Sequence, residues 1–266
     1  MIDSGRSNLA EMTSPEVGEL AGGTPTTVLL LPVGATEPHG PHAPLATDTI
    51  ISTATCDRAA ARLARDPDVR AVVLPAVPYG VTRFGAAFPG TVQVSEETLH
   101  ALLTDICRSL IGQGLRHLVI VNNHFEPEHV QVIREVVAEL EASGAAIALL
   151  DLLRRRNAER LTEEFRAGEC HAGRYETSIV LAERPDLVDD MRMRTLPRVA
   201  VNMPAAMAAG RRDFTAMGMP EAYCGSPAEA TAGEGESTLA TLTDMLVELI
   251  REVAARPADA AEQVAE

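Results

Sequence analysis

The sequence predicts an α/β fold: a three-layer α/β/α sandwich with a mainly parallel sheet, formed by a single domain. Four uninterrupted apolar runs have the length and composition of buried strands, at 27–33, 71–77, 118–121 and 145–150. Segments with helical spacing or capping residues follow them, and this alternation is typical of a parallel sheet covered by helices on both faces. With 266 residues and 46% hydrophobic content, the chain can bury a full core.

Capping and breaking residues bound the expected helices. Thr13-Ser14-Pro15-Glu16 forms a capping box that begins a short helix to about Leu20. Ser95 caps a helix to about Ile111, and Pro127 opens an amphipathic helix to about Ala142. The other expected helices span 49–65, 175–182 and 231–255.

The expected organisation is a frayed N-terminus at 1–11, the domain at 12–256 and a disordered tail at 257–266. Residues 185–228 are rich in Pro, Met and Gly and read as a long excursion. Loops of that length inside a domain are usually functional, so we expect either a lid or a subunit contact.

Composition excludes several classes of partner. The net charge of −15 argues against nucleic acid and anionic membrane surfaces. The four cysteines are widely spaced, which fits a reducing cytosol better than a disulfide framework. The N-terminal residues lack an apolar signal-peptide core, and no apolar stretch reaches membrane-spanning length. We therefore expect a cytoplasmic protein; the net charge says little about a small-molecule substrate.

The segment from Glu37 to Asp48 directly follows the first predicted strand, where open α/β sheets place their sites. Three prolines and a glycine stiffen it, so Glu37, His39 and Asp48 can be held in a fixed geometry. These side chains suit a zinc-like or manganese-like ion. An ordinary turn with solvated polar residues explains this segment, taken alone, about equally well.

Two more polar clusters follow later strands. His124-Phe125-Glu126 comes after the third strand, and His171 to Ser178 comes after the fourth strand and a helix. Because the carboxyl ends of parallel strands converge on one crevice, the three clusters can meet. Their carboxylates and histidines exceed what one zinc ion needs, and carboxylates commonly bridge two metals in hydrolytic sites.

These segments resemble the creatininase (creatinine amidohydrolase) family. The resemblance rests on Pro32 to His42 with Thr47-Asp48, on Phe88-Pro89-Gly90-Thr91, on His124-Phe125-Glu126, and on His171-Ala172-Gly173 with Glu176-Thr177-Ser178, all in the family's order. It spans roughly residues 12 to 255.

The resemblance implies an α/β/α metal-dependent hydrolase that cleaves the C–N bond of a small, possibly cyclic, amide and assembles as a homohexamer. It further implies two divalent ions, zinc and/or manganese, with a metal-bridged hydroxide as the nucleophile. By position, the implied metal ligands are Glu37, His39, Asp48, His124 and Glu126, with Asp48 as the bridge. His171 matches the histidine that protonates the leaving nitrogen, assisted by Glu126 or Glu176.

Two rival functions stay open. One is a creatininase-like peptidase that acts on a short peptide, as in mycofactocin precursor processing; the other is a metal-holding scaffold without turnover. Departures from the family pattern argue against creatinine itself. Trp is absent, Phe125 replaces an expected Tyr, and Gly85 replaces a His that many relatives carry. Ala167-Gly168 stands where creatininases proper offer Trp-Asp.

The remaining assignments concern the surroundings of the site. We expect Phe125, Tyr79 and Arg83 to contact substrate, although a surface salt bridge is favoured about two to one for Arg83. His42 is expected to be a hydrogen-bond partner behind the ligands rather than a ligand. His129 lies on the first turn of a helix, where exposure to solvent is the default expectation.

Overall fold

The computed structural model of the chain describes residues 6–258. At its centre lies a parallel sheet of four strands in the order β2-β1-β3-β4. The strands are β1 (Thr26–Val33), β2 (Val69–Val73), β3 (His117–Asn122) and β4 (Ala146–Leu150). The chain runs from β1 to β2 on one side and then to β3 on the other. The carboxyl ends of β1 and β3 therefore flank a switch point, where ligand sites form in such sheets.

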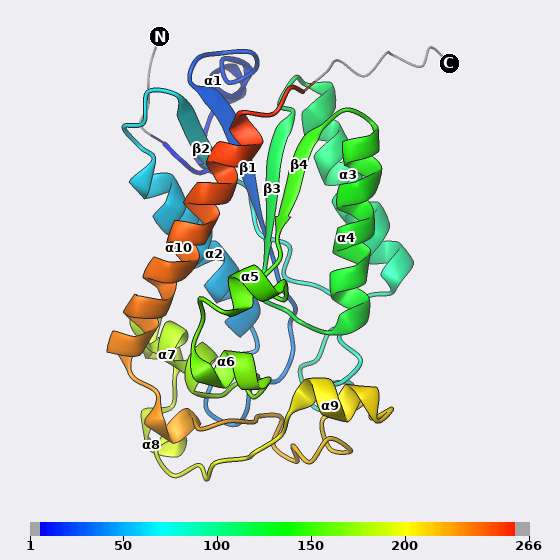
Figure 1. Cartoon of the computed structure of the whole chain (residues 1–266), viewed down its shortest axis with the longest axis vertical. Helices are drawn as coiled ribbons and strands as arrows, with labels where there is room; N and C mark the ends of the chain where they lie inside the picture. The colour runs from blue at the N-terminus through cyan, green and yellow to red at the C-terminus, as the bar shows by residue number, and fades with distance from the viewer. Residues whose placement is uncertain (1–5, 259–266) are drawn as a thin grey trace.

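Helices cover both faces of the sheet, which confirms the predicted three-layer fold (Figure 1). One face carries α2 (Thr47–Arg62), α7 (Arg174–Glu183) and α10 (Ala232–Ala254), and the other carries α3 (Glu96–Gly112) and α4 (Pro127–Ala142).

Alternation along β1 explains why its sequence is apolar without a break. Val28 and Leu30 pack under α2 and α10, whereas Leu29 and Leu31 pack under α3 and α4. Each fully buried leucine contributes about 1.5–3 kcal/mol to the free energy of folding. A polar residue at any of these positions would lose its water without gaining a partner.

Shorter elements complete the chain. They are η1 (Leu9–Glu11), α1 (Ser14–Gly18), α5 (Arg155–Ala158), α6 (Glu163–Ala167), η2 (Pro185–Leu187), α8 (Asp190–Met193), α9 (Met203–Ala208) and η3 (Pro227–Glu229). Helices α5, α6 and α9 gather at the end of the sheet where the strands terminate (Figure 1). Among residues 6–258, no helix has both the length and the apolar content needed to cross a membrane.

Several boundaries differ from the sequence prediction. Helix α2 begins at Thr47, so Asp48 lies in its first turn rather than in the preceding loop; the Thr47 hydroxyl donates to Pro44 O (2.7 Å) and closes that turn. Strand β2 ends at Val73, and Val77 forms only an isolated bridge with Val33.

The sequence predicts a frayed N-terminus at 1–11, but Asn8 bridges to Val73 and Leu9–Glu11 forms a 3₁₀ turn. Residues 1–5 and the predicted disordered tail beyond 258 lie outside the described range.

The 185–228 excursion folds at the carboxyl end of the sheet. Its Phe214, Met217 and Met219 build a small apolar cluster together with Phe84. The segment therefore has a core of its own and covers the region where the predicted site residues lie.

Candidate metal centre

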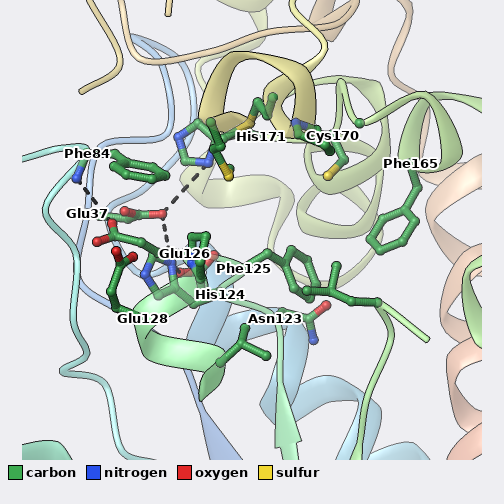
Figure 2. A pocket seen from close by; sticks show the side chains of 18 of the residues that line it. Glu37, Phe84, Asn123, His124, Phe125, Glu126, Glu128, Phe165, Cys170 and His171 are labelled. Carbon is green, nitrogen blue, oxygen red and sulfur yellow. Dashed lines mark hydrogen bonds and ion pairs between the residues drawn. The ribbon is translucent and has the colours of Figure 1, made fainter. Parts of the chain in front are cut away.

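Six buried polar side chains meet beyond the carboxyl ends of β1 and β3. They come from the loop after β1, the first turn of α2, the loop after β3, and the start of α7, and they are Glu37, His39, Asp48, His124, His171 and Glu176. Figure 2 shows Glu37, His124 and His171 turned toward one another. The convergence that the sequence predicts for three separate clusters is present in the structure.

Asp48 stands between two histidines. Its Oδ1 lies 3.0 Å from His39 Nε2, and its Oδ2 lies 3.2 Å from His124 Nδ1. The Ala35 N–H also donates to Oδ2 (3.3 Å). Helix α2 can bring the carboxylate this close because residue 34 is glycine: a Cβ there would lie 2.8 Å from Asp48 Cβ.

Glu37 contacts three imidazoles. Its Oε1 lies 3.1 Å from His124 Nδ1, 3.7 Å from His171 Nδ1 and 4.0 Å from His39 Nε2. Its other oxygen accepts from the Thr82 hydroxyl (2.5 Å), which fixes the carboxylate plane.

Glu176 completes the cluster from the first turn of α7. Its Oε2 lies 3.6 Å from His39 Nε2 and accepts the Ala172 N–H (2.7 Å). Three sets of donor atoms each lie within 4.8 Å of one another: Glu37–Asp48–His124, His39–Asp48–Glu176 and Glu37–His39–His171. The first two sets share only Asp48, so this carboxylate could join two cation positions.

The histidine tautomers suit cation binding. One ring nitrogen of each histidine lies against a backbone carbonyl, which can only accept: His39 Nδ1 at Glu37 O (3.1 Å), His124 Nε2 at Val81 O (2.8 Å) and His171 Nε2 at Pro38 O (3.1 Å). In the neutral ring, the opposite nitrogen then carries the lone pair and faces the carboxylates. Fixing the tautomer through the second nitrogen is how proteins orient metal-binding imidazoles.

The charge balance also suits cations. Burial disfavours charge on His39, but the carboxylates around it, Asp48 foremost, outweigh burial and raise its pKa to about 9. Burial raises the pKa of Glu176 to about 8. Burial, followed by the neighbouring His39, lowers the pKa of His171 to about 4. In the absence of metal, protons on His39 and Glu176 offset the negative charge of the buried carboxylates. Bound divalent cations could balance the same charge.

Glu126 lies apart from these donor sets. The Arg83 N–H donates to both of its carboxylate oxygens (2.9 and 2.8 Å), and the Phe84 N–H donates to Oε2 (3.1 Å). Burial raises its pKa. The sequence predicts Glu126 as both a metal ligand and a proton carrier, but Glu126 belongs to none of the donor sets. Glu176, predicted only for proton transfer, does belong to one of them.

The residues predicted to surround the metal ligands differ in their distance from the donor sets and from the cavity. His42 Nε2 lies 2.9 Å from the hydroxyl of Thr177, the residue that follows Glu176, and His42 belongs to none of the donor sets. Phe125 lines the cavity described below, whereas Tyr79 is 46% exposed and outside that lining. The Arg83 side chain pairs with Glu96 (2.5 Å) at the surface.

His129 is fully buried, so the expectation of solvent exposure is wrong. Its Nε2 lies 3.0 Å from Asn122 Oδ1, and the Val81 N–H donates to Nδ1 (3.3 Å). The ring packs edge-on against His124, with centroids 4.7 Å apart. Gly80 permits this packing, because a Cβ there would lie 2.6 Å from the His129 ring. Sequence spacing could not reveal this contact, since Gly80 comes from a distant loop.

A cavity of about 670 Å³ opens from the cluster. Glu37, Asp48, His124, His171 and Glu176 line one part of it, together with Phe84 and Phe214. Phe125 and Phe165 lie on the side of the cavity away from Glu37, with ring centroids 5.5 Å apart (Figure 2). Residues of α4, α5, α6 and α9 form the remaining walls. The cavity therefore combines a polar, acidic region with an aromatic one.

Comparisons with known proteins agree with this architecture. The chain matches the family described as "Creatininase: Creatinine amidohydrolase" over residues 10–250. It is 33% identical over 226 residues to the mycofactocin precursor peptide peptidase of Mycolicibacterium smegmatis, covering 84% of each chain. It is 34% identical over 194 residues to the creatinine amidohydrolase of Pseudomonas putida, covering 67% of this chain and 70% of the relative.

Solved creatininases share the fold. A crystal structure of creatinine amidohydrolase superimposes with a TM-score of 0.71 at 29% identity, covering 94% of this chain and 98% of the other. Similar structures are described as a Zn–Zn type and as creatininase Mn. The fold and these matches define a class, the hydrolases that act on C–N bonds. Within that class, the chain belongs to the creatininase family, as its sequence motifs predict.

Proposed function

We propose that this chain is a metal-dependent peptidase that hydrolyses a C–N bond in a short peptide. The observation that carries the proposal is the size and lining of the cavity beside the donor cluster. A volume of about 670 Å³ falls within the range of about 300–1,000 Å³ that pockets for drug-sized ligands occupy. A single five-membered ring would leave most of it unfilled.

The donor sets support two divalent ions, zinc or manganese as in the related structures. Glu37, Asp48 and His124 would hold one ion, and His39, Asp48 and Glu176 would hold the other, with Asp48 shared. When bound, such ions generate a nucleophile from water at neutral pH and polarise the scissile carbonyl.

His171 is the residue we assign to proton transfer. Its Nε2 is fixed by Pro38 O, and its Nδ1 faces Glu37 Oε1 at 3.7 Å. The lowered pKa leaves the imidazole neutral at pH 7, so Nδ1 can take a proton from the attacking water and pass it to the departing nitrogen. Glu126, held beside the cluster by two backbone N–H groups, would assist as a second proton carrier.

The sequence motifs alone favour a small, possibly cyclic, amide over a short peptide as the substrate. The peptide proposed here reverses that order. The peptidase relative matches over 84% of both chains, against 67% of this chain for the creatinine amidohydrolase. A small cyclic amide remains the second candidate because that relative is equally similar in sequence, at 34% identity.

The test is to incubate protein loaded with Zn²⁺ or Mn²⁺ with a panel of short peptides and, in parallel, with cyclic amides, and to detect products by mass spectrometry. Cleavage of peptides with no turnover of the ring compounds supports the proposal. Ring opening alone would assign the chain to small amides. Bound metal without turnover in either panel would identify a scaffold.

His171→Ala provides the mechanistic test. The variant should retain its metal content, because the two proposed ion sets do not include His171. Its kcat should fall by about 10²–10⁴-fold, the usual contribution of a positioned acid–base group. A near-normal kcat would remove His171 from the reaction.

A further inference from the structure

Besides Phe125 and Phe165, the lining of the cavity includes apolar side chains of α5 and α9, among them Ala158 and Met207. It also includes two arginines, Arg134 and Arg166. Arg166 directly follows Phe165 in α6, the helix that carries this part of the wall.

The two arginines differ in what they bind. The Arg134 guanidinium donates twice to Asp151 Oδ2 (3.1 and 2.9 Å), so its charge is balanced. Within residues 6–258, no side-chain hydrogen bond or ion pair joins the Arg166 guanidinium to another residue. Arg166 is exposed to solvent where it lines the cavity, so its charge is available to a ligand.

Two carboxylates that line the cavity outside the donor sets do not supply the missing partner. Glu96 and Glu128 both lie toward Arg83, at 2.5 and 3.9 Å. Arg166 is therefore the positive group on the lining that is left for a ligand.

Helix α6 presents Arg166 from a fixed position. The Thr162 side chain caps the helix by accepting the Phe165 N–H (3.3 Å). The buried Glu164 carboxylate accepts the N–H groups of Tyr175 (2.6 Å) and Ser226 (2.8 Å), which ties α6 to α7 and to the end of the excursion. At the other end, the Asn202 side-chain amide donates to Ala167 O (2.9 Å).

We propose that Arg166 determines specificity by binding a carboxylate of the substrate. An arginine stays charged at all physiological pH values, and its planar guanidinium can donate two parallel hydrogen bonds to a carboxylate. The aromatic pair Phe125 and Phe165 would hold an apolar side chain between that carboxylate and the scissile bond at the donor cluster. This inference rests on the proposed peptidase function and names its substrate class as anionic peptides.

The carboxylate could be the C-terminal group of the peptide or an Asp or Glu side chain, and the probes separate these sources. One pair of hexapeptides differs only in a free carboxylate or an amide at the C-terminus. A second pair, amidated at the C-terminus, differs only in Glu or Gln at an internal position. Binding of fluorescein-labelled versions to the Mn²⁺-loaded protein is measured by anisotropy, and cleavage of unlabelled versions by chromatography.

We expect the wild type to bind one carboxylate-bearing peptide at least about tenfold more tightly than its neutral partner, as for a charge-assisted hydrogen bond. Arg166→Met should abolish that preference without weakening the neutral peptide, and Arg166→Lys should retain part of it. Arg65→Met, which removes an exposed arginine outside the cavity lining, is the matched control and should preserve the preference.

The outcomes distinguish the two proposals. An acid preference that depends on Arg166, without any cleavage, supports the role of Arg166 and contradicts the peptidase assignment. Cleavage with no acid preference, or with a preference that survives Arg166→Met, overturns the role of Arg166 and leaves the peptidase standing. Neither binding nor cleavage of any peptide overturns both.

Discussion

The imidazole of His171 stacks on the phenyl ring of Phe214, with ring centroids 4.4 Å apart and planes inclined by 26°. Phe214 belongs to the 185–228 excursion and also meets Phe84 and Phe88 edge-on, at 6.1 and 6.3 Å. The excursion therefore supplies a wall of the cavity beside the imidazole to which we assign proton transfer. We expect residues 185–228 to form either a lid or a subunit contact, and the stacking of Phe214 on His171 agrees with a lid.

The stack predicts different effects for two replacements of Phe214. Phe214→Leu keeps much of the buried volume but removes the flat surface against His171, so we expect retained metal and a reduced kcat. Phe214→Ala leaves a cavity and should lower the free energy of unfolding by about 3–5 kcal/mol. Phe88→Leu is the control, because Phe88 contacts Phe214 and not the imidazole. An unchanged kcat in Phe214→Leu would show that the stack does not matter for turnover.

Asp48→Asn tests whether one carboxylate joins two ion positions. Asparagine keeps the size of the side chain but provides no negative charge for either donor set, so metal content measured by mass spectrometry should fall for both ions. Asp57→Asn alters an exposed acid of the same helix and should retain the metal. Full occupancy in the Asp48 variant would contradict the shared role.

Much of the fold can be read from the sequence because its determinants are local. The apolar runs of β1, β3 and β4 are continuous, and Pro127 with its following periodicity predicts the observed bounds of α4. A predicted helix boundary is wrong where a local turn extends the helix beyond the apolar periodicity. At the start of α2, the Thr47 hydroxyl donates to Pro44 O, and the helix begins at Thr47 and includes Asp48.

The sequence predicts that three polar clusters converge, but it does not predict how their side chains are arranged. Polar residues that directly follow parallel strands come together, because the carboxyl ends of those strands lie at the same edge of the sheet. The sequence cannot indicate that the Arg83 and Phe84 N–H groups hold Glu126 beside the donor sets, or that Glu176 approaches His39. Those contacts depend on how the loop after β2 and the start of α7 fold over the sheet.

Metal binding should release protons at neutral pH. The pKa of His39 is raised to about 9 and that of Glu176 to about 8, so both groups carry protons at pH 7 in the metal-free protein. A metal ligand must lose that proton, hence affinity should rise as pH increases toward 9 and fall as pH decreases. Mn²⁺ titration calorimetry in two buffers of different protonation enthalpy should give different apparent binding enthalpies. Equal enthalpies, with affinity constant from about pH 6.5 to 8.5, would refute this coupling.

Substitutions at two glycines near the start of α10 test whether the packing of this helix against α7 holds Glu176 in position. A Cβ at Gly235 would overlap the carbonyl oxygen of Ser178 in α7, two residues beyond Glu176, whereas a Cβ at Gly233 would meet open space. Gly235→Ala must push the helices apart, so we expect a loss of about 1–3 kcal/mol in the free energy of unfolding. Because the displaced turn of α7 carries Glu176, Mn²⁺ affinity should fall as well.

Gly233→Ala is the matched control for that variant. Alanine favours the helix over glycine by about 1 kcal/mol in a helix interior, so this variant should be as stable as the wild type or slightly more stable, with unchanged Mn²⁺ affinity. Urea unfolding and metal titration measure both effects. If Gly235→Ala lost stability but bound Mn²⁺ normally, the position of Glu176 would not depend on the packing of α7 against α10. Its contact with the Ala172 N–H would then be sufficient to hold the carboxylate at the cluster.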